Sequence, residues 1–168
     1  MKVVSYYCEG ETEMSLVSSL KGKKNIAPGR VKKFNLWQDQ ISKIERTFKE
    51  GGVLIFIIDT DAMNPSNIFI DNIKKLKKWN FCLRIQNKNL EYELCFSCGK
   101  SGKPALYKDF YDCNSVSEFK NKLNKDNNLY RTLERNQFDF KKLWTRSSHF
   151  KSHFHSCLPK IDSYICDN

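Results

Sequence analysis

The stretch Val53-Leu54-Ile55-Phe56-Ile57-Ile58-Asp59-Thr60-Asp61 places two aspartates directly after six consecutive apolar residues. The apolar part is mostly β-branched or aromatic, which predicts a central strand covered on both faces. A similar apolar run, Val3 to Cys8, ends in Glu9-Gly10-Glu11-Thr12-Glu13. In open α/β sheets, ligands and catalytic groups lie at the carboxyl ends of parallel strands. We therefore expect the two acidic segments to meet at one edge of a sheet.

Hydrophobic periodicity outside these runs predicts alternating strands and helices, the pattern of a right-handed parallel βαβ sheet. The predicted fold class is α/β, with a Rossmann-type, mostly parallel central sheet flanked by helices. Residues 1–100 are expected to form the core and 101–168 a mostly helical C-terminal extension packed on it as one compact unit. The further elements predicted are strands over 31–37 and 81–85, and helices over 11–20, 39–50, 68–79, 90–96, 116–123 and 129–138.

The charge of the chain indicates a polyanionic partner. Its formal net charge is +10, from 29 basic and 19 acidic residues, and both the first 100 residues (+6) and the remainder (+4) are positive. A positive field distributed in this way suits DNA, RNA or an anionic membrane surface. The alternative is a lysine-rich surface whose charge only keeps the protein soluble.

Seven cysteines, an odd number, favour free thiols in a reducing compartment. The chain opens directly into a strand-like run and reaches acidic residues by Glu9, which is unlike a secretory signal. The longest apolar run is Val53 to Ile58, far shorter than a membrane span. We therefore predict a cytoplasmic protein without a membrane partner.

Crowded carboxylates at the end of two strands predict a divalent-cation site. Glu9 and Glu13 are four residues apart across a strand-to-helix turn, and Gly10 lets the backbone turn tightly beside them. Asp59 and Asp61 are two apart, so in extended backbone both point to the same side. Such carboxylates repel one another, and Mg²⁺ or Mn²⁺ relieves the repulsion. Helix N-terminal charge for the glutamates and a turn role for Asp59 are the alternatives.

An apolar strand followed by Glu-Gly-x-Thr-Glu, and some fifty residues later another followed by Asp-x-Asp, resembles the Toprim domain. Among Toprim proteins the chain is similar to the RloB-like and OLD-type nucleases of bacterial defence systems, over roughly residues 1–95. The segment Asn87-Lys88-Asn89-Leu90-Glu91-Tyr92-Glu93-Leu94 is similar to an Asn-Pro-x-Phe-Glu-like segment of RloB-like proteins. It departs from that pattern at Lys88, in place of proline, and at Leu90, in place of phenylalanine.

The resemblance implies a Toprim-like fold and a Mg²⁺-dependent nuclease that hydrolyses phosphodiester bonds of DNA or RNA, with tRNA included, in anti-phage defence. Glu9 would be a metal ligand or general acid/base, and Asp59 and Asp61 would be catalytic residues that bind Mg²⁺. Glu13 would complete a second metal position, and Glu91 would lie near the site. Such proteins often work with an ATPase partner. The alternative is a non-catalytic nucleic-acid-binding or regulatory subunit with the same fold.

Other phosphate motifs fit less well. The run ending in Asp59 resembles a Walker B strand, but the chain contains no phosphate-binding loop of the form G-x-x-x-x-G-K-[ST]. Haloacid-dehalogenase phosphatases also have Asp-x-Asp after a strand, usually the first strand, and with threonine or valine where this chain has Met63. Lys100 and Lys103, in a predicted loop, are candidates for binding nucleic-acid phosphates, with a solvated loop as the alternative.

Two further groups of residues have a functional and a structural interpretation. Cys95-x-x-Cys98 together with histidines and a cysteine near the C-terminus suggests zinc, but a single CxxC pair is a weak signal. Three aromatic residues near Lys108 could stack on nucleic-acid bases, although a satellite core is the favoured interpretation. The residues concerned are His149, His153, His155 and Cys157 for zinc, and Tyr107, Phe110 and Tyr111 for stacking.

Overall fold

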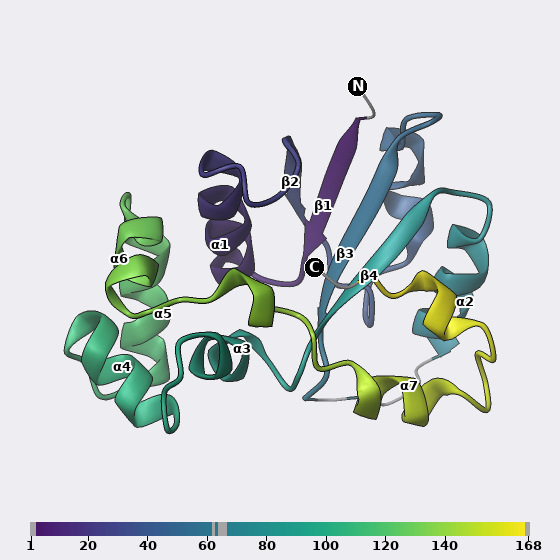
Figure 1. The fold of residues 1–168 in the computed structure, drawn as a ribbon. Helices are drawn as coiled ribbons and strands as arrows, with labels where there is room; N and C mark the ends of the chain where they lie inside the picture. Colours follow the sequence, from purple (N-terminus) through teal and green to yellow (C-terminus); the bar gives the residue numbers. More distant parts are fainter. Residues whose placement is uncertain (1–2, 62, 64–66, 167–168) are drawn as a thin grey trace.

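A four-stranded, all-parallel sheet forms the centre of the protein, and helices cover both of its faces (Figure 1). The computed structural model describes residues 3–61, 63 and 67–166. The strand order is β2-β1-β3-β4, and the predicted α/β fold class, with a Rossmann-like arrangement, is confirmed. The strands are β1 (Val4–Cys8), β2 (Gly29–Lys33), β3 (Val53–Asp59) and β4 (Phe81–Gln86).

The sheet separates two hydrophobic cores. Tyr6 and Ile57 point into one core, whereas Tyr7 and Phe56, their neighbours along the strands, point into the other. Successive side chains of a strand alternate between faces, so a strand that is apolar throughout can serve both cores. The five central residues of β3 before Asp59 are buried, as its continuous apolar sequence predicts.

Helices lie on both sides of the sheet, in two groups (Figure 1). The first group is α1 (Glu11–Gly22), α3 (Leu90–Ser97), α4 (Lys103–Tyr111), α5 (Val116–Lys125) and α6 (Leu129–Arg135). The second is α2 (Asn67–Leu76) and α7 (Ser148–Phe154). On one side of the sheet, α1 and α3 pack on the strands and α4, α5 and α6 pack against these two helices; α2 and α7 lie on the other side. The described part of the C-terminal extension, residues 101–166, therefore contributes side chains to both cores.

The helix predicted over 39–50 is wrong. Two short 3₁₀ helices, Ile41–Lys43 and Glu45–Thr47, occupy this segment. The buried side chain of Asn72 on α2 accepts a hydrogen bond from the Ile41 amide at 2.8 Å and donates to the Leu36 and Asp39 carbonyl groups. These contacts hold the backbone in a path that a continuous α-helix would not follow, so tertiary contacts override the helical pattern.

Other element boundaries also differ from the prediction. The second strand begins at Gly29 and ends at Lys33 instead of spanning 31–37. Helix α4 begins at Lys103, inside the loop predicted over 98–104, and α7 lies in the weakly patterned C-terminal region. The last helix of the first group ends at Arg135, before the predicted Phe138.

The C-terminal segment lies against the outer strand β4. Ile165 forms an isolated parallel bridge with Leu83, and the Cys166 amide donates to the Leu83 carbonyl oxygen at 3.0 Å. A disulfide joins Cys82 of β4 to Cys166. The prediction of free thiols is therefore wrong for this pair, because the bridge to β4 brings together two cysteines 84 residues apart. Cys8, Cys95, Cys98, Cys113 and Cys157 are free.

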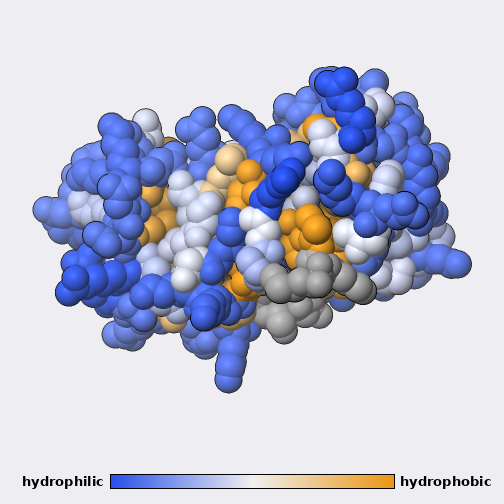
Figure 2. All heavy atoms as spheres, turned by 90° about the horizontal axis from the view of Figure 1, so that it is seen from above, coloured by the Kyte–Doolittle hydropathy of each residue, from blue (hydrophilic) through white to orange (hydrophobic). Residues whose placement is uncertain are grey.

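The face of the molecule shown in Figure 2 is largely hydrophilic. Figure 2 views the end of the molecule at which β1 begins, and there hydrophilic residues surround a few hydrophobic ones near the middle. No helix in the described part of the chain is long and apolar enough to cross a membrane. The acidic residues predicted to act together lie at the other end of the strands.

Candidate metal and phosphate site at the carboxyl edge of the sheet

Glu9 and Asp59 meet where the two central strands end. Strands β1 and β3 pair in parallel with Cys8 opposite Ile57, so the residues that follow them emerge side by side. The Glu9 carboxylate accepts a hydrogen bond from the Asp59 amide at 3.3 Å. Its other oxygen, Oε2, accepts from the side-chain nitrogen Nδ2 of Asn35 at 3.5 Å. The expectation that both acidic segments lie at one edge of the sheet is confirmed.

Glu13, in the first turn of α1, turns back toward the same edge and is buried. A Cβ atom on Gly10 would lie 2.6 Å from the Glu13 carboxylate oxygen Oε2. The absence of a side chain at Gly10 therefore makes room for this carboxylate, since real Cβ contacts are essentially never so short. The atom concerned is the far end of a flexible side chain, and the Gly10 backbone is extended (φ −132°, ψ 173°), so neither a tight turn nor a rigid contact demands glycine here.

Glu91 on α3 and Lys120 on α5 complete the acidic cluster formed by Glu9, Glu13 and Asp59. Glu91, near the start of α3, is almost fully buried, and its Oε1 lies 3.1 Å from the Lys120 ammonium group on α5. Glu13 and Asp59 also interact with the Lys120 charge. Burial would lower the pKa of Lys120, but attraction to Glu91 and the other acids raises it. Sequence reasoning missed Lys120 because no local pattern on α5 distinguishes it from the other lysines.

The environment of Asp59, Glu9 and Glu13 disfavours the charged forms of their carboxyl groups. Burial raises the pKa of Asp59 to about 9, and the charges of Glu13, Glu9, Asp61 and Glu91 add to the shift. Burial likewise raises the pKa of Glu9 to about 8, partly opposed by the hydrogen bond from the Asp59 amide. The pKa of Glu13 is raised mainly by burial. Carboxyl groups held in this way retain protons at neutral pH unless a cation compensates their charge.

Asp61 lies beyond the end of β3, in a turn, and is exposed. Between the two aspartates, Thr60 is buried, and its hydroxyl group donates to the Gln86 carbonyl oxygen at 2.8 Å. Asp61 therefore contributes charge at the mouth of the cluster, where it raises the pKa values of Glu9 and Asp59. Met63 follows within the described residues, whereas 62 and 64–66 lie outside them.

The donor chemistry of the cluster fits a hard cation, since carboxylate oxygens suit Mg²⁺ and Mn²⁺. Among the described residues, Asp59 Oδ1 is buried without a hydrogen-bond partner, and so are both polar side-chain atoms of Gln86, which lies opposite Asp59 in the strand pairing. Within the described residues, however, no three acidic, histidine or cysteine side chains are arranged to hold one ion. Glu9, Glu13, Asp59 and Glu91 could hold an ion only after their carboxylates turn toward one another.

The two lysines predicted to bind phosphate, Lys100 and Lys103, have different surroundings in the structure. Lys100 forms an ion pair with Asp109 at 2.7 Å, and its side chain is only 16% exposed. Its charge is therefore already compensated within the protein. Lys103 is the first residue of α4, and its ammonium group lies over the Tyr92 ring, 4.6 Å from the ring centroid.

The zinc interpretation gains no support from the described residues. Cys95 and Cys98 are buried in the core on the α1 face, whereas α7, with His149 and His153, covers the opposite face. Tyr107 and Phe110 are buried in the same core as the cysteines, and Tyr111 packs against it, so these rings are core residues, in the main core on this side of the sheet and not in a satellite.

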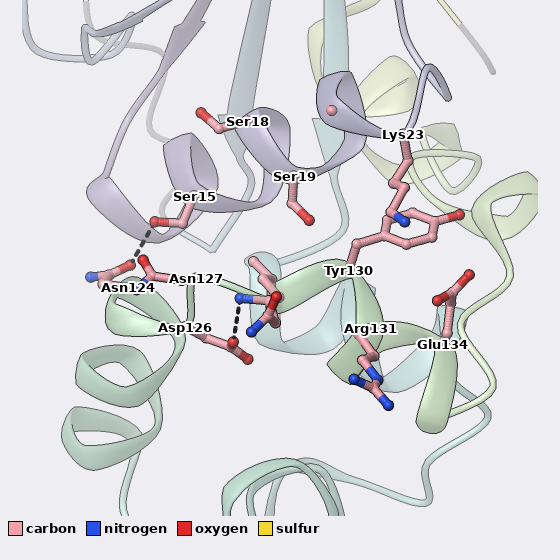
Figure 3. Close-up of a pocket in the computed structure, with 13 residues that line it drawn as sticks. Ser15, Ser18, Ser19, Lys23, Asn124, Asp126, Asn127, Tyr130, Arg131 and Glu134 are labelled. Carbon is pink, nitrogen blue, oxygen red and sulfur yellow. Dashed lines mark hydrogen bonds between the residues drawn. The ribbon is translucent and has the colours of Figure 1, made fainter.

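A separate polar pocket of about 650 Å³ lies between α1 and the turn that joins α5 to α6 (Figure 3). Ser15 on its wall donates to the Asn124 side chain at 3.3 Å, and Lys23 lies over the Tyr130 ring, 5.4 Å from its centroid. None of the acidic residues of the cluster lines this pocket. Its polar groups come from α1, α5 and α6, and it is a feature distinct from the carboxylate edge.

Compared with known proteins, the chain matches no family model, no curated protein and no solved structure.

Proposed function

We propose that the protein is a Mg²⁺- or Mn²⁺-dependent nuclease of the Toprim type that hydrolyses phosphodiester bonds of DNA or RNA. The observation that carries the proposal is the convergence of Glu9, Glu13, Asp59 and Glu91 at the carboxyl edge of a parallel sheet. Burial raises the pKa values of Glu9, Glu13 and Asp59, inside a chain of net charge +10. A positive field attracts a polyanion, whereas a compact acidic cluster repels one unless a cation bridges the two.

Each residue has a role in this proposal. Asp59, Glu9 and Glu13 provide the oxygen ligands, and a bound divalent ion would activate water and stabilise the charge of the leaving oxygen. The pKa of about 8 belongs to Glu9 in the metal-free protein, and a bound cation would lower it, so that Glu9 would be a charged ligand at neutral pH. Lys120 compensates Glu91 and keeps that buried carboxylate in place. A role in bacterial defence and an ATPase partner follow from the resemblance alone and belong to the proposal.

The test is incubation of the full chain with single-stranded DNA, double-stranded DNA and total RNA, in Mg²⁺, Mn²⁺ or EDTA. We expect cleavage of at least one substrate with a divalent ion and none in EDTA. Asp59→Asn and Glu9→Gln should each lower the rate by about 100-fold or more. Glu11→Gln, which removes an exposed carboxylate from the first turn of α1, two residues after Glu9, is the matched control and should retain activity. Cleavage that persists in EDTA or in Asp59→Asn would contradict the proposal.

One observation favours a second candidate, a non-catalytic nucleic-acid-binding subunit of the same fold. Lys120 already compensates Glu91, and no three acidic groups among the described residues are positioned around a shared ion. A protein of this kind would bind nucleic acid equally well in EDTA and in Mg²⁺, and would not cleave it. Binding without cleavage in both Mg²⁺ and Mn²⁺ selects this candidate.

A further inference from the structure

Two lysines approach the same aromatic ring beside the acidic cluster. The ammonium groups of Lys88 and Lys103 lie 4.4 Å and 4.6 Å from the centroid of the Tyr92 ring. Tyr92 follows Glu91 in α3, so the ring stands one residue from a carboxylate of the cluster. Burial raises the pKa of the Cys95 thiol; the Lys103 charge opposes this shift and the Glu91 charge adds to it. Lys103 and Glu91 therefore both lie near the Cys95 sulfur atom.

The backbone at Lys88 is strained and firmly held. Its φ of 66° lies in the left-handed region, where a lysine is uncommon. The Lys88 amide donates to the Thr60 hydroxyl at 2.8 Å, and its carbonyl oxygen accepts from the Thr60 amide at 2.7 Å. Thr60 stands between Asp59 and Asp61. Strain that the surrounding structure maintains is often found at binding sites, and here it fixes Lys88 to the loop that carries the aspartates.

Lys88 and Lys103 differ from their basic neighbours in lacking an acidic partner. None of the ion pairs found among the described residues involves either lysine, whereas Lys100 pairs with Asp109 and Arg146 pairs with Glu93. Lys103 opens α4, whose N-cap Gly102 provides no side-chain hydrogen bond. A helix N-terminus carries partial positive charge, so it adds to the attraction for an anion at this point.

We propose that Lys88, Tyr92 and Lys103 form a clamp for an unpaired nucleic-acid strand, with the lysines on backbone phosphates and the Tyr92 ring stacked on a base. The clamp deepens the proposed function and rests on it, because it names the substrate as single-stranded. Each ammonium now lies over the ring, and phosphate oxygens offer it a stronger partner. A ring face released in this way can accept an unstacked base, whereas bases within a duplex keep their faces covered.

The test is fluorescence anisotropy with a labelled single-stranded oligonucleotide and its duplex, in EDTA so that cleavage does not interfere. In the full chain, Lys88→Gly with Lys103→Gln should weaken binding and reduce the salt slope by about 1.4, the effect of losing two single-strand phosphate contacts. Glycine is at ease at the φ of Lys88, so this variant should keep its fold. Lys49→Gln, a matched loss of an exposed charge just before β3, should leave the slope unchanged.

The ring is tested separately from the charges. Tyr92→Leu should weaken single-strand binding by roughly 5- to 150-fold without changing the salt slope, whereas Tyr92→Phe should bind like the wild type. The clamp would be overturned if Tyr92→Leu and Tyr92→Phe bound the single strand equally well, or if the lysine variant kept the wild-type salt slope. It would also be overturned if the variants weakened duplex binding as much as single-strand binding. If the variants weaken binding as expected but the wild type cleaves nothing in Mg²⁺ or Mn²⁺, the clamp is supported and the nuclease is refuted. Cleavage unaffected by them would refute the clamp alone.

Discussion

We expect the buried carboxyl group of Asp59 to cost the metal-free protein stability. Its pKa is raised to about 9 by burial and by neighbouring acids, so the folded protein disfavours its charge. Asp59→Asn removes that charge while keeping a similar shape. We expect the metal-free variant to be more stable than the wild type by on the order of 1 kcal/mol. Thermal melting with and without Mg²⁺ measures this, and equal Mg²⁺ stabilisation of both proteins would contradict a metal role for Asp59.

Glu93, two residues after Glu91, has a structural role that the acidic pattern of α3 did not reveal. This fully buried carboxylate accepts hydrogen bonds from the amides of Asn87 and Trp144, at 2.8 Å and 3.0 Å, and from Arg146 at 3.1 Å. It therefore joins the loop after β4 to the segment before α7.

Glu93→Ala should lower the free energy of unfolding by about 3 kcal/mol, because it removes the acceptor of two backbone amides and the partner of Arg146. Urea denaturation measures the loss. Glu118→Ala breaks an exposed ion pair with Lys122 on α5 and should cost less than about 1 kcal/mol. Similar losses for the two variants would show that Glu93 does not have this joining role.

At the scale of elements, the pairing of β1 with β2 depends on Gly29. A Cβ atom at this position would lie 2.5 Å from the Val4 carbonyl oxygen, and backbone cannot move aside as a flexible side chain can. Gly29→Ala should therefore destabilise the protein by about 1–3 kcal/mol. In the same assay Gly22→Ala, at the end of α1 with no described atom within 4 Å of the added carbon, should be neutral or stabilising. Equal effects would rule out close approach at Gly29.

The disulfide ties the C-terminal segment to β4. Cys166→Ser should lower the free energy of unfolding by about 2–4 kcal/mol under oxidising conditions, since the cross-link constrains the unfolded chain. Hydrogen exchange should show faster exchange in 161–166. Cys157→Ser, which removes an exposed free thiol, serves as the control. A reductant should abolish the difference between Cys166→Ser and the wild type; a difference that persists would mean that the bond does not cause it.

At the scale of the whole molecule, stability should depend on pH through the acidic cluster. The pKa values of Asp59 and Glu9 are raised to about 9 and about 8 in the folded protein, against roughly 4 for unfolded carboxyl groups. Between these limits the folded state binds more protons, so metal-free stability should be greatest near about pH 4–5 and fall as pH rises toward about 9. Urea denaturation across this range checks the sign. Asp59→Asn should flatten the decline, and stability that increases over this window would contradict the raised pKa values.

Local pattern was sufficient for the sheet and for part of the site. The continuous apolar run before Asp59 identifies a doubly covered strand, and the position of Glu9 after a second such run places the two acids at one edge. The same reasoning failed over 39–50, where helical spacing is present but the buried Asn72 imposes another backbone path. The spacing of apolar residues indicates which side chains prefer burial. It does not indicate which polar side chains, such as Asn72, will form hydrogen bonds with the backbone of another segment.

The sequence by itself determined the α/β class, the central strands and the acids that end them, because these depend on residues close together in the chain. Only the tertiary structure decided that Lys120 reaches Glu91, that Lys88 and Lys103 share the Tyr92 ring, and that Cys82 joins Cys166. It also decided that Lys100 is compensated by Asp109. Each of these contacts depends on how helices and chain ends pack on the sheet, so the residues involved carry no local signal of it.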